Sequence, residues 1–251
     1  MIVLKNDKLR VVDAQDAGDI AQKTLDVFLK SAQEAISQKG SFKVAISGGK
    51  TPRHLYELLA DSPLAAELNW DNIHIFWVDE RCVSPESEDS NYKLASDTFL
   101  EKLPVVSANV HRIFGECRDY SSAVAKYEDV IREVFEIATG ELPEFDLIIL
   151  GMGPDGHIGS LLPNSYALFD TDDIASVVYQ MDGGLDRITI THPVMYAAGK
   201  IVIMVSGSEK SDIVREVLLG KPDEVKYPVH TLWPILEKVL WIIDNDAAGK
   251  L

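Results

Sequence analysis

FDLIILG (145–151) is an almost unbroken apolar run, and the glycine-rich stretch MGPDGH (152–157) follows it directly. A short apolar run that ends in glycines is typical of a strand buried on both faces within a parallel sheet. The stretch therefore indicates an α/β fold, with the loop after this strand at the carboxyl edge of the sheet.

Five other short runs predict strands: FKVAIS (42–47), IHIFWVD (73–79), IASVVYQ (174–180), KIVIMVSG (200–207) and KVLWIID (238–244). Helical spacing predicts helices at residues 14–38, 51–60, 90–100, 120–139 and 208–219, the first with Asp16 or Asp19 as its N-cap. This alternation predicts a Rossmann-like, doubly wound and mostly parallel sheet with helices on both faces. Because no repeat or linker divides the chain, we expect one domain over residues 1–251.

The charge balance bears on possible partners. The 251 residues include 40 acids and 24 bases, a formal net charge of -16, which argues against a nucleic-acid or anionic-membrane partner. Charges interrupt the N-terminal stretch MIVLKNDKLRVVDAQD (1–16) too early for a signal peptide, and no run approaches the roughly 20 apolar residues of a membrane span. Only Cys82 and Cys117 occur, without a CxxC spacing, which favours reduced thiols and a cytoplasmic location.

Ligands of open α/β sheets bind beyond the carboxyl ends of the strands. Four strand ends in this chain carry polar chemistry: SGGKTP (47–52), DERCV (79–83), GMGPDGH (151–157) and SGSEK (206–210). We therefore expect these four segments to meet around one site.

The segment SGGKTP joins a strand to a helix. Gly48 and Gly49 allow a tight turn and a close approach of the backbone to a ligand, while Lys50, Thr51 and the helix N-terminus favour an anion such as phosphate. The segment matches neither the Walker pattern nor GxGxxG, and a tight turn without a ligand remains the alternative.

The segment DERCV places two acids beside a cation. Arg81 offers a planar fork for phosphate or carboxylate, and Asp79 is suited to orient Arg81 or to hold a sugar hydroxyl. The alternative is a solvated ion-pair cluster without a function. Further along, Ser90 is expected to cap the next helix.

His157 is framed by glycines at a strand end, where a histidine is well placed to act as a general base. A structural hydrogen-bonding role is the alternative. Asp155 has three possible roles: partner of the imidazole, ligand of substrate hydroxyls, or turn former. No metal is expected because HExxH and similar ligand patterns are missing, and Ser160 is not the nucleophile of a GxSxG elbow.

Two further cations, Arg187 and Lys210, flank segments that should reach the same sheet edge. Exposed cations are usually solvated surface charges. The sequence predicts Lys210 in the first turn of its helix, where a cation opposes the helix dipole, so a bound anion would offset that cost.

Taken together, SGGKTP (47–52), WVDERCV (77–83), FDLIILGMGPDGHIGSLLP (145–163), RITIT (187–191) and IVIMVSGSEK (201–210) resemble the 6-phosphogluconolactonases. The resemblance implies a fold like that of glucosamine-6-phosphate deaminase and ribose-5-phosphate isomerase. It also implies hydrolysis of 6-phospho-D-glucono-1,5-lactone in the pentose phosphate pathway, without a metal or cofactor and as a monomer or weak homodimer.

The resemblance also implies roles for individual residues. His157 would activate water, Asp155 would support it, and phosphate and sugar would be held by the predicted binding residues: Gly48, Gly49, Lys50, Thr51, Asp79, Arg81, Arg187 and Lys210.

The chain departs from the family pattern DGHTASLFP at Ile158, Gly159 and Leu162, and we assign no role in the site to His230. The nearest alternative is a glucosamine-6-phosphate deaminase/isomerase, whose corresponding segments resemble DGHIAFNEP and MDEY. A non-catalytic sugar-phosphate sensor is a second alternative. The segments SLLPN and WVDERCV favour the lactonase.

Overall fold

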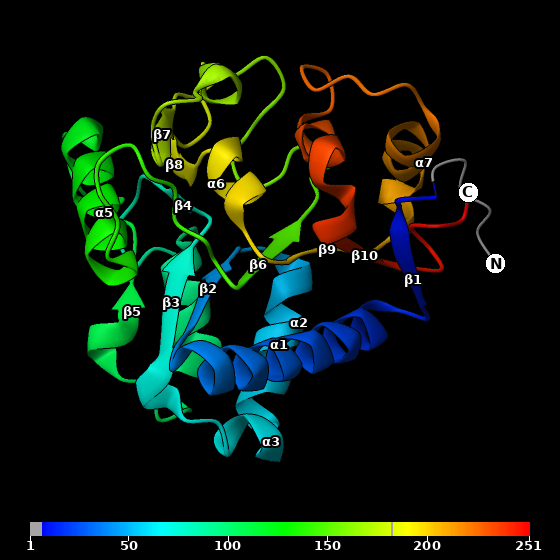
Figure 1. Ribbon diagram of the computed structural model, residues 1–251. Helices are drawn as coiled ribbons and strands as arrows, with labels where there is room; N and C mark the ends of the chain where they lie inside the picture. Colours follow the sequence, from blue (N-terminus) through cyan, green and yellow to red (C-terminus); the bar gives the residue numbers. More distant parts are fainter. Residues whose placement is uncertain (1–6, 182) are drawn as a thin grey trace.

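A parallel sheet forms the centre of the computed structural model, which describes residues 7–181 and 183–251 (Figure 1). The first six residues of the N-terminal stretch MIVLKNDKLRVVDAQD (1–16) lie outside the described residues. Within the described part the strand order is β1-β10-β9-β6-β2-β3-β5, and all pairings are parallel. The strands are β1 (Arg10–Ala14), β2 (Phe42–Ile46), β3 (Ile73–Trp77), β5 (Val110–His111), β6 (Leu147–Gly151), β9 (Ile201–Val205) and β10 (Val239–Asp244). The mostly parallel α/β sheet predicted from the sequence is confirmed.

Helices cover both faces of this sheet. Figure 1 shows α1 and α2 below the sheet, with α6 and α7 above it. The helices are α1 (Ala17–Lys39), α2 (Lys50–Asp61), α3 (Pro63–Ala66), α4 (Asn91–Ala95), α5 (Tyr120–Phe135), α6 (His192–Ala197) and α7 (Ser211–Leu219). Short 3-10 segments are Trp70–Asn72, Ser107–Asn109, Tyr166–Phe169, Ser208–Lys210 and Pro228–Lys238, and a π-helical turn, Ser96–Leu100, follows α4.

The first helix begins later than predicted. Ala14 ends strand β1, and the Asp16 side chain accepts a hydrogen bond from the N–H of Asp19, which starts α1 at Ala17. Of the two expected N-caps, Asp16 is therefore the one confirmed. The predicted helix 120–139 ends earlier, at Phe135, because Glu136 adopts a left-handed conformation (φ 55°).

A second, antiparallel sheet has the order β4-β8-β7, with β4 (Asp79–Arg81), β8 (Arg187–Ile190) and β7 (Ala175–Val178). The run 174–180 was predicted as a strand and does contain β7, but β7 lies outside the parallel sheet. Val78 joins the two sheets, since its N–H donates to the Ile46 carbonyl and its own carbonyl accepts from Ile190 N–H. This connection places the start of β4 beside the carboxyl ends of β2 and β3.

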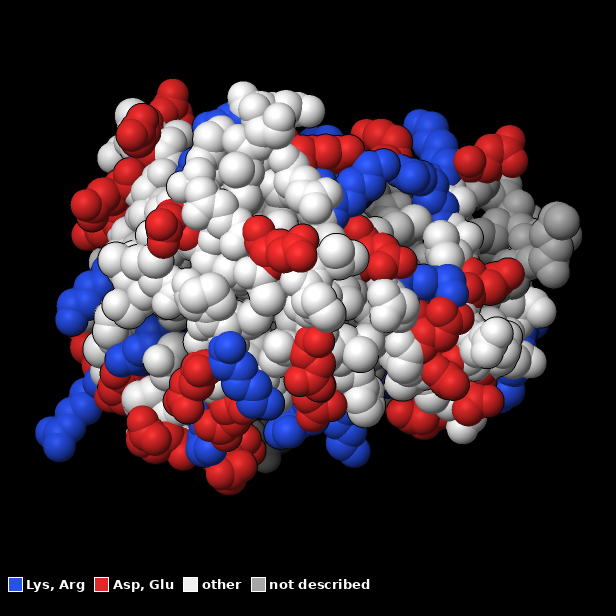
Figure 2. Space-filling model, turned by 90° about the horizontal axis from the view of Figure 1, so that it is seen from below, with Lys and Arg blue, Asp and Glu red and all other residues white. Residues whose placement is uncertain are grey.

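Charged side chains surround the face seen in Figure 2, where acidic and basic groups are interspersed around a broad uncharged area. At the upper right of this view several basic side chains adjoin one another, with acidic side chains beside them. Within residues 7–181 and 183–251, no helix has the length and apolar character needed to cross a membrane.

Candidate active site

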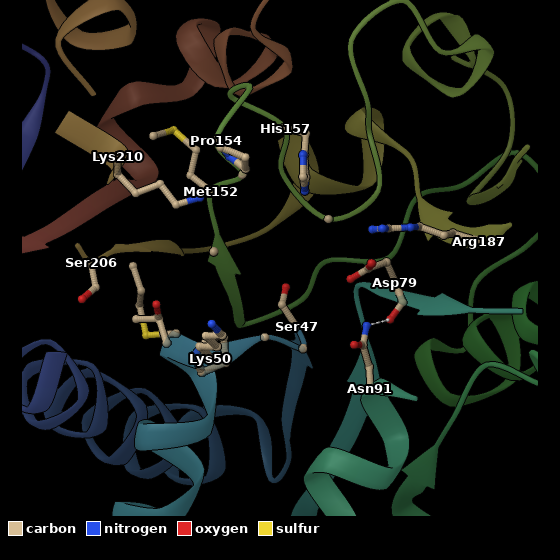
Figure 3. A pocket seen from close by; sticks show the side chains of 18 of the residues that line it. Ser47, Lys50, Asp79, Asn91, Met152, Pro154, His157, Arg187, Ser206 and Lys210 are labelled. Atoms are coloured by element: carbon tan, nitrogen blue, oxygen red, sulfur yellow. Dashed lines mark hydrogen bonds between the residues drawn. The ribbon is translucent and has the colours of Figure 1, made fainter. Parts of the chain in front are cut away.

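A pocket of about 300 Å³ lies at the carboxyl ends of β2, β6 and β9, beside the antiparallel sheet (Figure 3). The predicted site residues that line it are Gly48, Gly49, Lys50, Thr51, Asp79, Arg81, His157, Arg187 and Lys210. Asp155 does not line the pocket. The four polar segments that follow strands in the sequence therefore meet around one cavity, as expected for an open α/β sheet.

The turn between β2 and α2 forms one wall of this pocket. Gly49 caps α2 with a φ of 114°, a conformation that favours glycine, and no side chain caps the helix. A Cβ at Gly48 would lie 1.8 Å from Asn91 Oδ1, so only glycine fits beside that amide. The uncapped N–H groups of α2 and the adjacent Lys50 are thus available to an anion.

Arg81 and Arg187 lie directly opposite each other on the antiparallel strands β4 and β8. Like charges in this position are destabilising unless something neutralises them. An Arg81 Nη1 donates to the Asp89 carbonyl (2.5 Å), but the Nε atoms of both arginines are buried without a hydrogen-bond partner. Both arginines line the pocket, so their positive charge is available to an anion there.

Asp79 is buried, at 5% exposure. It was expected either to orient Arg81 or to hold a sugar hydroxyl, and in the structure its Oδ2 accepts a hydrogen bond from Ser160 Oγ (2.6 Å). Its carbonyl accepts from Asn91 Nδ2 (2.8 Å), the bond drawn in Figure 3. Arg81 Nη1 bonds to the Asp89 carbonyl instead of to Asp79, so for Asp79 the role of holding a sugar hydroxyl stays a prediction.

Glu80, the residue between these two, is a buried carboxylate that holds the following loop in place. Its oxygens accept bonds from the N–H groups of Arg81, Asn91 and Tyr92 (2.7–2.8 Å) and from Ser90 Oγ (3.0 Å). Burial raises the pKa of Glu80, and these four bonds offset the rise only in part. Ser90 Oγ also accepts from the N–H of residue 93, which confirms it as the N-cap of α4.

Replacing Glu80 with glutamine is expected to reduce the free energy of unfolding by about 2 to 3 kcal/mol, because the new amide NH₂ faces buried donors that lose their acceptor. Urea unfolding followed by circular dichroism measures this change. Glu88→Gln on the same loop is the matched control, since that side chain is 90% exposed. Equal stability of the two variants would contradict the anchoring role.

The loop after β6 presents His157. Gly153 N–H donates to the His157 carbonyl (2.8 Å), and Gly156, with a φ of 81°, closes the turn. A Cβ at Gly153 would lie 2.2 Å from the imidazole, so glycine is required for the ring to occupy this position. The glycines that framed His157 in the sequence therefore serve to place its ring at the pocket.

Asp155 contacts His157 twice. Its Oδ1 lies 2.6 Å from His157 Nδ1 and accepts from the His157 backbone N–H (3.2 Å), so two of its three expected roles, imidazole partner and turn former, are both present. Burial is the largest influence and tends to raise the pKa of Asp155, but the side-chain bond to His157, the charge of that ring and the backbone N–H bonds together hold this pKa below its usual value. An ionised carboxylate only accepts, which assigns the proton to Nδ1 and leaves the Nε2 lone pair free.

Ile158 and Gly159, two of the residues that depart from the family pattern, are closely packed against their neighbours. Ile158 is fully buried and forms β-bridges with Met152 and Leu161. Gly159 has a φ of 53°, and a Cβ there would lie 2.8 Å from Val78 Cγ1. An apolar side chain and a glycine at these two positions thus suit the contacts that the loop makes.

Lys210 ends the short 3-10 segment before α7 rather than lying in the first turn of that helix. Burial lowers its pKa, while the negative charges of Glu209 and Asp155 partly restore it. In Figure 3 its side chain extends toward Met152. The cation therefore approaches the pocket from the side of β9.

Sequence reasoning did not assign a role to Asn91, Ser160, Ser206 or Glu209. Asn91, Ser206 and Glu209 line the pocket, and Ser160 lies behind it. His230, left without a role, is buried away from the pocket, where Nδ1 accepts from Asp223 N–H and Nε2 donates to a carbonyl of α7. Ser206 and Glu209 belong to SGSEK (206–210) and Ser160 follows DGHIG, but the Asp79 partner of Ser160 is 81 residues away, so the sequence did not indicate that contact.

Cys82 and Cys117 carry free thiols. Across residues 7–181 and 183–251, no three His, Cys, Asp or Glu side chains are grouped so as to hold a metal ion.

The chain is similar to known proteins over most of its length. Residues 15–241 match the family model described as glucosamine-6-phosphate isomerases/6-phosphogluconolactonase. The chain is 36% identical to a 6-phosphogluconolactonase of Nostoc sp., over 94% of this chain and 95% of that protein. The crystal structure of 6-phosphogluconolactonase from Thermotoga maritima is similar, with a TM-score of 0.79 and 25% identity over 94% of this chain and 100% of that one.

A monomeric glucosamine-6-phosphate deaminase also has this fold, with a TM-score of 0.83 over 97% of this chain and 100% of that one, at 20% identity. The fold is therefore common to both activities and does not separate them. With the family model covering most of its length and close relatives over nearly all of it, the chain belongs to the family of glucosamine-6-phosphate isomerases and 6-phosphogluconolactonases.

Proposed function

We propose that this protein hydrolyses 6-phospho-D-glucono-1,5-lactone to 6-phospho-D-gluconate, the lactonase step of the oxidative pentose phosphate pathway. The observation that carries the proposal is the pairing of His157 with Asp155 at one edge of a pocket that also gathers Lys50, Arg81 and Arg187. Its curated relatives in Nostoc and Synechocystis, at 36% and 35% identity, bear the name 6-phosphogluconolactonase.

The reaction begins with a water molecule that His157 Nε2 deprotonates as its oxygen attacks the lactone carbonyl carbon. The tetrahedral intermediate then collapses, the bond between C1 and the ring oxygen breaks, and the imidazolium returns its proton to that oxygen. Asp155 keeps Nδ1 protonated and stabilises the imidazolium charge. Cations and backbone N–H groups of the pocket stabilise the developing oxyanion.

The phosphate is remote from the reacting carbon and supplies binding energy that orients the lactone. We assign it to the guanidinium groups of Arg81 and Arg187, which come from paired positions on β4 and β8, with Lys50 and the N-terminus of α2 lining the same pocket. An anion there neutralises positive charges that line one pocket. Asp79, Thr51 and Lys210 are left for the sugar hydroxyls and the carboxylate product.

The decisive experiment generates the lactone enzymatically and compares its hydrolysis with and without purified protein. We expect hydrolysis well above the spontaneous rate, and no release of ammonia from glucosamine 6-phosphate. Ammonia release without lactone hydrolysis would instead favour the deaminase, and binding of 6-phosphogluconate with neither turnover would favour a sensor.

We also infer that residues 1–251 act as one domain, in the cytoplasm, as a monomer or weak homodimer. The buried core, which includes residues of both sheets, supports the single domain, and the free thiols suit a reducing compartment.

A further inference from the structure

Ser160 follows His157 by three residues and is fully buried. Its hydroxyl donates to Asp79 Oδ2 (2.6 Å) and accepts from Arg187 Nη1 (3.4 Å), while its backbone N–H donates to Thr189 Oγ1 (3.2 Å). One residue thus connects the His157 loop to both β4 and β8.

The two side chains held by this hydroxyl have few other partners. Among the described residues, Ser160 is the only hydrogen-bond donor to the Asp79 carboxylate and the only acceptor for the Arg187 guanidinium. A buried carboxylate is costly without donors, and a long arginine side chain without an acceptor samples many rotamers. The orientation of both groups therefore depends on the same hydroxyl.

The three side chains come from different sheets. His157 follows β6 of the parallel sheet, whereas Asp79 and Arg187 begin β4 and β8 of the antiparallel sheet. Asp79 and Arg187 line the pocket, and Figure 3 shows them on the same side of it, facing His157. Ser160 is therefore the polar link that relates the groups proposed to bind substrate to the group proposed to activate water.

We propose that Ser160 is a positioning residue for substrate binding, whose hydroxyl fixes Asp79 and Arg187 in the orientation that holds the sugar phosphate. The proposal rests on the proposed function for the identity of the ligand. Ser160 does not line the pocket, and its proton is bonded to Asp79, so it acts through these two residues rather than on the substrate.

Ser160→Ala is expected to raise KM for the lactone about tenfold and to change kcat less than about threefold, because it weakens binding of the ground state and the transition state alike. The matched control is Ser165→Ala, since Ser165 Oγ is a buried hydroxyl nearby in the chain with no hydrogen-bond partner. The control should leave KM unchanged. A fall in kcat at unchanged KM, or a lower melting temperature with both constants unchanged, would overturn the positioning role.

A double-mutant cycle with Asp79→Asn separates positioning from a general packing effect. If Ser160 acts through Asp79, adding Ser160→Ala to Asp79→Asn should raise KM less than about threefold further. Multiplicative effects of the two substitutions would show independent roles and overturn the proposal. Should Ser160→Ala fail to fold, Ser160→Cys keeps a weaker donor of similar shape, and its KM should lie between those of the wild type and Asp79→Asn.

Calorimetric binding of 6-phosphogluconate tests Ser160 separately from catalysis. If the wild-type protein did not turn over the lactone, the proposed function would be refuted. The role of Ser160 is tested separately, by the ratio of the dissociation constants for 6-phosphogluconate between Ser160→Ala and the wild type. We expect a ratio of about ten, in line with the change in KM, and equal dissociation constants would overturn the role of Ser160.

Discussion

Replacing His157 with alanine is expected to lower kcat for lactone hydrolysis about a hundredfold or more, which is the usual contribution of a general base. Among the described residues that line the pocket, no other histidine is present to replace the imidazole. KM should change little, because the proposed phosphate ligands lie elsewhere in the pocket. Initial rates with freshly generated lactone, corrected for spontaneous hydrolysis, measure the effect.

His54→Ala serves as the control for this substitution. His54 lies on α2 with a half-exposed side chain, and its Nδ1 is 3.7 Å from Glu57 Oε2. Its removal should leave kcat unaltered. If His157→Ala retained a kcat within about threefold of the wild type while remaining folded by circular dichroism, the water-activating role would be wrong.

Asp155→Asn is expected to lower kcat about a hundredfold while leaving KM nearly unchanged, since Asp155 does not line the pocket. The amide carries no charge to stabilise an imidazolium, and its NH₂ can donate to Nδ1 and so favour the tautomer with Nε2 protonated. Rates measured at saturating lactone give kcat directly.

The pH dependence adds a second readout for Asp155. Its pKa lies below the usual 3.8, so the carboxylate is charged throughout the neutral range, and the gap between wild type and variant should persist from about pH 6 to 8. Asp129→Asn, at a side chain that is 80% exposed, is the control. A gap that closed within this range would assign the effect to another group.

The parallel sheet was largely predictable because its strands are continuous apolar runs with local signals. Strand β1 was missed because its sequence, RVVDA, has only two adjacent valines between charged residues, and its last residue, Ala14, was predicted to start a helix. β5 is two residues long, too short for a pattern. The antiparallel sheet was not predicted because each of β4 and β8 is a strand only through its pairing with the other. Arg81 pairs with Arg187, and the sequence around neither residue indicates that pairing.

The gathering of most of the predicted site residues around one pocket has a related reason. Gly49, Lys50, His157 and Lys210 follow strands directly, and parallel strands bring their ends together whatever the strand order. The contacts behind the pocket were not predictable in this way. Ser160 and Asp79 are 81 residues apart and meet only because the loop of β6 passes beside β4.

The antiparallel sheet also bears on how the protein is made. Thr189 Oγ1 bonds to the Val78 carbonyl across 111 residues, so β4 has no partner strand until β8 has been synthesised. A ribosome-bound chain that has completed only its first three parallel strands carries Lys50 and Arg81 but neither His157 nor Arg187. Contacts of such long range form slowly. Sugar-phosphate binding is therefore expected to appear in the nascent chain only once the segment beyond residue 190 has left the exit tunnel, and no shorter N-terminal fragment should bind the ligand.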